Sequence, residues 1–163
     1  VADNMRNVAV TEGDKVEAQM KFGREIDAYP VNEIAEYVQD VSQGDIDVLV
    51  EEYYNKYDIL LDGRDPEEFK KHVAVQAGIE IGFERFLEEK NYQAIVTHFG
   101  DLGSLKQLPG LAIQRLMEKG YGFGGEGDWK TAAMGIEAVY IDGDTTIRNL
   151  QNELRWNSMY FSK

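Results

Sequence analysis

The 163 residues carry 30 acidic against 17 basic side chains, a formal net charge of −13, and no cysteine. A chain of this size can bury one hydrophobic core, so neither disulfides nor a structural metal is needed to explain its stability. The lack of cysteine excludes thiol nucleophiles, cysteine-bound zinc and iron–sulfur clusters, and it fits a cytoplasmic protein. The acidic charge and the short apolar runs exclude nucleic acid and membrane as expected partners.

The first third of the chain predicts one strand and two helices. β-branched residues at 7–11 favour a strand. Asp14 is suited to cap a helix that ends at Gly23, and apolar residues at helical spacing predict its buried face: Val16, Met20 and Phe22. Asn32 is expected to cap a second helix over 34–41.

Two longer helices are predicted next. Apolar and aromatic residues at helical spacing indicate a helix over 45–57, in which three tyrosines are expected to pack as core and rim: Tyr53, Tyr54 and Tyr57. The Asp-Pro pair at 65–66 is typical of a helix start, and the pattern continues to about residue 90. Gly78 and Gly82 weaken the middle of this helix and permit close packing.

Strands and helices alternate in the second half. The predicted order is strand 92–97, helix 111–119, strand 121–124, helix 129–134, strand 136–142 and helix 145–159. This alternation favours an α/β fold in one domain, with a parallel sheet in three layers of the Rossmann or flavodoxin-like type. Ligands of such sheets bind at the carboxyl ends of the strands, here the loops 99–101, 124–128 and 142–144.

The segment 122–127 has the GxGxxG spacing of dinucleotide-binding loops, and Asp142 follows its first glycine by twenty residues. Glu126 lies inside this loop and would repel a pyrophosphate, and the predicted helix 129–134 is too short for a normal crossover. A plain glycine-rich turn, or a site built around Glu126 itself, is therefore the preferred interpretation.

Glu126 and Asp128 bring two carboxylates to one open loop, as a hard-metal or general-base site requires. For Asp128 we favour helix capping over either of these roles. His72 is expected on a solvated helix face. His98 follows a strand, and a structural or exposed role is favoured for it over a functional one.

The segments 105–117 and 120–133 closely resemble L-arabinose isomerases, and 3–16 resembles the start of that family's central domain. Segment 136–157 resembles the extreme C-terminus of the same family. The resemblance implies a central α/β domain over 1–133, onto which a C-terminal strand and helix over 134–163 pack. It also implies that the family's N-terminal domain and most of its C-terminal domain are absent.

The implied reaction is the isomerisation of L-arabinose to L-ribulose with a divalent metal, usually Mn²⁺. The resemblance assigns Glu126 as a metal ligand and as the acid/base glutamate, and Met5 and Phe99 as residues of the sugar pocket. The family's other metal ligands, one glutamate and two histidines, have no counterpart in this chain. Three positions depart from the family pattern, His98 from a threonine, Gly100 from a glutamate and Arg24 from an aromatic residue.

These features predict a chain that belongs to a sugar isomerase but is inactive alone and binds no metal by itself. The alternative is a standalone α/β structural or weak ligand-binding module that arose by a deletion, natural or engineered. Exposed former interfaces would favour a homo-oligomer, which the acidic net charge partly opposes.

Overall fold

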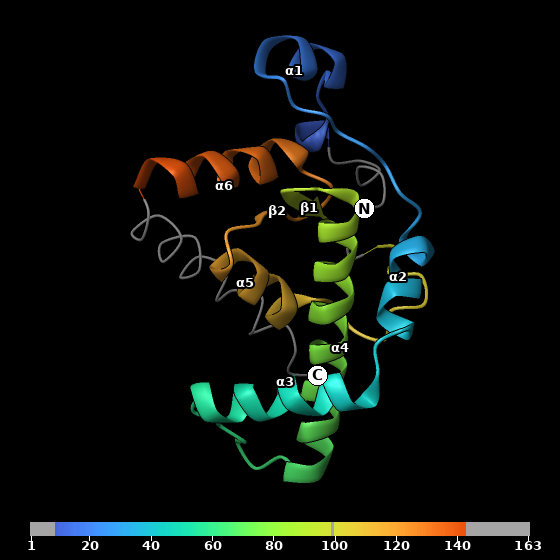
Figure 1. The fold of residues 1–163 in the computed structure, drawn as a ribbon, viewed down its shortest axis with the longest axis vertical. Helices are drawn as coiled ribbons and strands as arrows, with labels where there is room; N and C mark the ends of the chain where they lie inside the picture. The colour runs from blue at the N-terminus through green and yellow to red at the C-terminus, as the bar shows by residue number, and fades with distance from the viewer. Residues whose placement is uncertain (1–8, 99, 143–163) are drawn as a thin grey trace.

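A computed structural model describes residues 9–98 and 100–142. Figure 1 shows the long helix α4 (Pro66–Lys90) as the axis of the molecule, and α2 (Val31–Gln39), α3 (Gln43–Lys56) and α5 (Gly110–Glu118) pack against it. Helix α6 (Trp129–Asp142) packs on the two strands, β1 (Ala94–Val96) and β2 (Gly122–Gly124). None of the described helices is long and apolar enough to cross a membrane.

The first described element is a 3₁₀ turn, Ala9–Thr11, and the strand predicted over 7–11 is therefore wrong for these residues. Residues 7 and 8 lie outside the described part of the chain. Glu12 N donates a hydrogen bond to Ala9 O at 3.1 Å, which closes the turn. In the described part of the chain no strand pairs with this run, so a local turn satisfies its backbone better than an extended conformation would.

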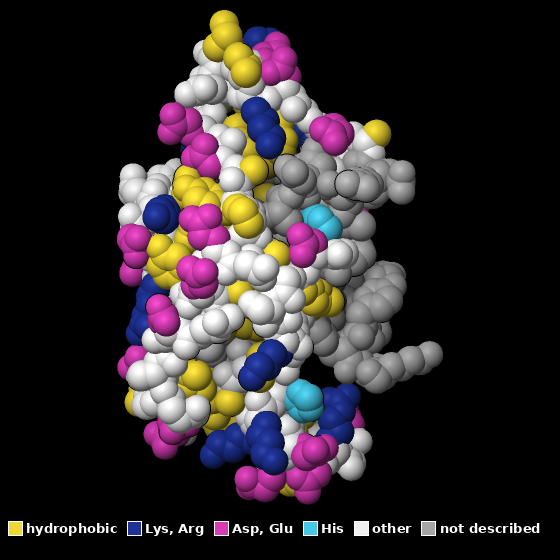
Figure 2. Space-filling model, turned by 90° about the vertical axis from the view of Figure 1, so that its right-hand side faces the viewer, with side chains coloured by type: hydrophobic (Ala, Val, Ile, Leu, Met, Phe, Trp, Pro, Cys, Tyr) yellow, Lys and Arg dark blue, Asp and Glu magenta, His cyan; other side chains and the backbone are white. Residues whose placement is uncertain are grey.

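Helix α1 (Lys15–Phe22) begins and ends where the sequence predicts. The Asp14 side chain accepts from Glu17 N at 2.8 Å, and Gly23 ends the helix in the left-handed region, at φ 66°. The predicted buried face is wrong, because α1 stands away from the body of the molecule (Figures 1 and 2) and buries only Ala18. Its large apolar side chains are 65–81% exposed: Val16, Phe22 and Met20.

Helix α2 begins earlier than predicted and without the predicted cap. Pro30 occupies the N-cap position, and no side chain caps the helix. The Asn32 Oδ1 atom instead accepts from Ser104 N at 3.0 Å, which ties the start of α2 to the loop after β1. Proline restricts the backbone before the helix, so the chain can enter α2 without a capping side chain.

Helices α3 and α4 match the prediction closely. Ser42 caps α3 by accepting from Asp45 N at 3.2 Å, and the helix begins at Gln43, two residues before the predicted start. Tyr53 is buried and Tyr54 is exposed, so the predicted core-and-rim packing is confirmed. Asp65 caps α4 by accepting from Glu68 N at 2.9 Å.

The two strands are parallel, in the register Ala94 to Gly122 and Val96 to Gly124, and α5 lies between them in sequence. This confirms the predicted α/β class. Ile95 belongs to a core cluster shared with α2, α4 and α5. The glycines of β2 lie against α6, since a Cβ at Gly122 would meet Ala132 O at 2.2 Å.

Helix α6 is continuous where the sequence predicts a short helix and then a strand over 136–142. Gly135, which lies between the predicted helix and the predicted strand, packs against the backbone of β2, where a Cβ would be 3.5 Å from Gly122 Cα. Ile136 is buried one helical turn after Ala132, so packing on the sheet keeps the apolar segment helical. The predicted helix 145–159 lies outside the described residues.

Two clusters form the interior. The larger joins α2, α4, β1 and α5, and its least exposed members are Ile34, Ile79, Phe83, Phe86, Leu87, Ala112 and Leu116. The smaller joins α3 to the first half of α4 and contains Val50, Tyr53, Val73 and Ala77. Both rest on α4, which positions the strands relative to the other helices.

Candidate functional site

The loops that follow β1 and β2 lie together, because parallel strands place their carboxyl ends at one edge. Backbone hydrogen bonds join the loops: Thr97 N donates to Gly124 O at 3.3 Å, and Gly127 N donates to Thr97 O at 3.1 Å. The predicted juxtaposition of these strand ends is therefore present. It places Thr97, directly after β1, beside the glycine-rich loop that carries Glu126.

Glu126 lies in this loop with its backbone in the left-handed region, at φ 57°. Few residues other than glycine adopt this conformation, and it is held here by the neighbouring Gly127, at φ 77°, and by a bond from Asp128 N to Gly125 O at 2.9 Å. The side chain is half-buried. A strained backbone at a strand end is a common device for presenting a functional side chain.

Asp128 caps α6, as predicted. Its Oδ1 atom accepts from Lys130 N at 3.1 Å and from Thr131 N at 3.2 Å, and its Oδ2 atom accepts from the Thr131 hydroxyl at 2.7 Å. The carboxylate is thus committed to the first turn of the helix. Of the two acids in the loop, Glu126 is the one that remains a candidate for chemistry.

The glycine spacing of 122–127 has a packing explanation. A Cβ at Gly124 would lie 2.0 Å from Asp128 O, so α6 can approach β2 only because this position has no side chain. Asp142, the acid that a dinucleotide site would place at a strand end, is the last residue of α6. The helix after the motif is longer than predicted, 14 residues, so its length does not argue against a crossover.

The two histidines lie in different places. His98 follows β1, and its Nδ1 atom accepts from Gly100 N at 3.0 Å, so the ring folds over its own loop. His72 is exposed on α4, and its Nδ1 atom lies 3.1 Å from Gln107 Nε2. The structure does not bring His72 to the strand ends. Among the residues described, no three or more His, Asp or Glu side chains form a group that could hold a metal ion.

The other two predicted site residues, Met5 and Phe99, lie outside the described residues. Phe99 is flanked in sequence by His98 and Gly100. A Cβ at Gly100 would lie 3.2 Å from the His98 ring, so these two departures from the family pattern are structurally coupled.

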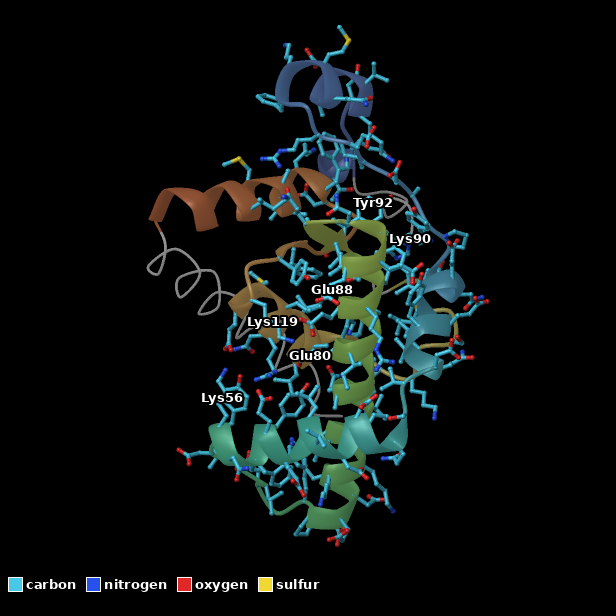
Figure 3. All side chains as sticks on the ribbon, viewed as in Figure 1. Lys56, Glu80, Glu88, Lys90, Tyr92 and Lys119 are labelled. Atoms are coloured by element: carbon cyan, nitrogen blue, oxygen red, sulfur yellow. The ribbon has the colours of Figure 1, made fainter. Side chains whose placement is uncertain are left out.

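A buried polar cluster between α3, α4 and α5 was missed by sequence reasoning (Figure 3). Glu80 is fully buried, and its Oε2 atom accepts from Arg115 Nε at 2.8 Å and from the Tyr53 hydroxyl at 2.5 Å. Lys119 Nζ lies 3.0 Å from the other oxygen of Glu80. The available signal was a charged residue in an apolar stripe of the predicted helix, since Glu80 lies three residues after Ala77 and seven after Val73.

Electrostatics in this cluster follow from burial and pairing. Burial and the hydrogen bond to Glu80 raise the pKa of Tyr53 far above its usual range. Burial alone lowers the pKa of Lys119, but its bonds with Glu84 and Glu80 raise it overall. The cluster fixes α5 on α4 and so holds the chain that leads into β2. Its groups are paired with one another, and we assign them no chemistry.

Comparison with known proteins adds the family. The L-arabinose isomerase central domain model matches residues 1–142. L-arabinose isomerase of Geobacillus kaustophilus is 50% identical over 145 residues, which cover 88% of this chain and 29% of that enzyme. The Serratia proteamaculans enzyme is 53% identical over 143 residues, covering 86% and 28%. L-arabinose isomerase 1 of Clostridium acetobutylicum is 54% identical over 132 residues, covering 81% and 27%. The chain therefore spans less than a third of the length of these relatives.

Proposed function

This chain belongs to the L-arabinose isomerase family, and we propose that it forms the central part of an enzyme that interconverts L-arabinose and L-ribulose. The observation that carries the proposal is the position of Glu126. Its loop lies at the carboxyl end of β2, hydrogen-bonded to the loop after β1, where α/β sheets bind their ligands. Asp128, the other acid of the loop, is occupied as a helix cap.

Isomerisation of an aldose to a ketose needs a base that moves one proton between neighbouring carbons. Glu126 would remove the proton from C2 of the open-chain sugar and return it to C1 of the enediol, while a second proton moves from O2 to O1. The carboxylate is regenerated at the end of the reaction, so atoms and charge balance. We propose that Met5 and Phe99 line the sugar pocket beside it.

The family resemblance implies Mn²⁺ at Glu126, but the described residues alone do not fit such an ion. A divalent cation of this type takes about six ligands, and the glutamate supplies one carboxylate. The described chain gathers no further group of acids and histidines around it. We therefore propose that the 163 residues alone do not turn over sugar.

We also propose that the two strands belong to a three-layer α/β arrangement. Ile95 packs toward α4 and α5, whereas Gly122 and Gly124 lie against α6, which supports helices on both faces. In this arrangement Glu126 lies at the edge of the sheet and is reached from outside the strand ends.

The test uses an enzyme as long as these relatives that contains this 163-residue segment. Glu126→Gln is expected to lower kcat by at least about 10²-fold, because the amide cannot act as a base. Asp128→Asn is the matched control, because asparagine also caps helices and should keep most of the activity. Wild-type turnover in Glu126→Gln would contradict the assignment. Turnover by the 163-residue chain, lost in its own Glu126→Gln variant, would contradict the proposed inactivity.

A further inference from the structure

A groove of about 460 Å³ lies between segment 23–29, the junction of α4 with β1, and α6. Its lining includes Arg24 and Asp27 from the first segment, all of β1, and Trp129 at the start of α6. Glu126 is not one of the lining residues. The volume falls within the range of small-molecule sites in proteins. The proposed isomerase reaction does not use this groove.

Aromatic rings form one part of the groove. The Tyr29 ring lies edge-on to Phe86, with centroids 5.2 Å apart, and edge-on to Tyr92, at 5.8 Å. The Phe86 and Tyr92 rings are stacked at 5.9 Å. Phe86 is buried and anchors the other two, which are half-buried. The rings therefore hold one another in place before any ligand arrives.

Fixed polar groups adjoin these rings. The Tyr92 hydroxyl donates to Asp27 Oδ2 at 2.5 Å, and the Tyr29 and Tyr92 hydroxyls lie 2.9 Å apart. Figure 3 shows Tyr92 and Lys90 near the same end of α4. The Arg24 guanidinium donates to Gln93 Oε1 at 3.5 Å. The Asp27 carboxylate is exposed and has more lone pairs than the Tyr92 hydroxyl uses.

The charges of the lining balance. Arg24 and Lys90 carry two positive charges, and Glu25 and Asp27 carry two negative charges. On the α6 side, the indole N–H of Trp129 is buried with no acceptor among the described residues. This N–H has almost no exposed surface, so it is not a contact for a ligand in the groove. A balanced lining does not select a strongly charged ligand.

From these features we propose that the groove binds a neutral pyranoside, a sugar with a closed ring. The C–H face of such a ring is apolar and fits against tyrosine rings, and its hydroxyls donate to a carboxylate and accept from N–H and O–H groups. Asp27 is the acceptor for a pair of hydroxyls, and Tyr92 supplies the ring surface. The site is separate from Glu126, and this proposal can be tested independently of the isomerase proposal.

The test uses the 163-residue chain in EDTA and methyl β-L-arabinopyranoside, whose ring cannot open and which the proposed isomerase reaction cannot consume. Trp156→Phe leaves Trp129 as the single tryptophan, so its fluorescence reports on the groove. We expect a saturable change with a Kd in the millimolar range. Asp27→Ala combined with Tyr92→Phe should weaken binding at least tenfold, and Tyr54→Phe on exposed α3 surface should leave it within twofold.

Far-UV circular dichroism and the urea midpoint establish that each variant is folded. If the double variant does not fold, Asp27→Ala alone, at an exposed position, takes its place with an expected loss of about fivefold. A linear response without saturation would overturn the proposal, as would equal affinity in the Asp27 variants. Loss of the signal in Glu126→Gln would also overturn it, because the sugar would then bind at the strand ends.

Discussion

Arg115 and Glu80 form an ion pair inside the protein, with Arg115 Nε 2.8 Å from Glu80 Oε2 and side chains 5% and 0% exposed. Arg115 also donates to Glu52 at 2.5 Å and lies over the Tyr53 ring, 4.8 Å from its centroid. Desolvation of two charges is costly, so the pair is tolerated only because these additional contacts satisfy both groups. The pair therefore joins α4 to α5, and removal of either residue alone should lower the stability of the fold.

Removal of one partner should destabilise the protein strongly. Arg115→Met leaves the Glu80 carboxylate buried with fewer compensating donors, and we expect a loss of about 3–5 kcal/mol in the free energy of unfolding. Urea denaturation followed by circular dichroism measures it. The matched control is Arg85→Met, because Arg85 pairs with Asp45 at 2.9 Å but both side chains are about half exposed, 45% and 51%. That pair should contribute at most about 1 kcal/mol, and equal losses in the two variants would contradict the role of burial.

Two glycines of α4 should respond oppositely to alanine. A Cβ at Gly82 would lie 2.6 Å from Val38 Cα, so Gly82→Ala must push α2 away from α4 and should cost at least about 1–3 kcal/mol. A Cβ at Gly78 would meet Ile46 Cδ1 at 3.5 Å, an ordinary contact. Gly78→Ala should then be neutral or stabilise by up to about 1 kcal/mol through helix propensity. Thermal unfolding of both variants checks this, and destabilisation by Gly78→Ala would show that the approach of α3 is closer than described.

The ends of α1 and α4 could be predicted because each carries its own local signal. Asp14, Asp65 and Pro66 act on the backbone within three residues, and no tertiary partner is needed to predict them. The strand predicted over 136–142 fails for the opposite reason. Its apolar residues suit either structure, and contact with β2 selects the helix, which no local pattern reveals.

In the candidate site, too, local features could be predicted and long-range packing could not. The glycine-rich loop and its position after a strand were predictable, and so was the capping role of Asp128. The buried cluster was not predicted, because Glu80 and Arg115 are 35 residues apart and only the packing of α5 on α4 brings them together. The proposed role of Glu126 comes from the resemblance to a family, because residue spacing alone left that role open.

Two glycines of the glycine-rich loop test whether a glycine is needed there for close packing with α6. A Cβ at Gly124 would lie 2.0 Å from Asp128 O, so Gly124→Ala should displace α6 and cost at least about 1–3 kcal/mol. The neighbouring Gly125 has no atom within 4 Å of its Cβ position, and Gly125→Ala should change stability by no more than about 0.5 kcal/mol. Urea midpoints measure both. Similar values for the two would mean that α6 does not depend on the bare backbone of β2.

Tyr53 makes the free energy of unfolding depend on pH in the alkaline range. Burial, followed by the hydrogen bond to Glu80, raises the pKa of Tyr53 above its usual value of about 10. Above that pH the unfolded chain loses the phenol proton and the folded chain keeps it. The folded state then binds more protons, and stability must fall as pH rises, by up to about 1.4 kcal/mol per pH unit for this group.

Tyr53→Phe isolates this contribution. At pH 7 the variant should be less stable by about 1–3 kcal/mol, because the Glu80 carboxylate loses a hydrogen bond at a buried position. Phenylalanine does not ionise, so the difference between wild type and variant should shrink as pH rises from 10 to 11. Urea denaturation at pH 7, 9, 10 and 11 measures the difference, and Tyr54→Phe on the exposed side of α3 is the control that should show no such trend. A constant difference across this range would mean that Tyr53 ionises alike in the folded and unfolded chains, against its burial beside a carboxylate.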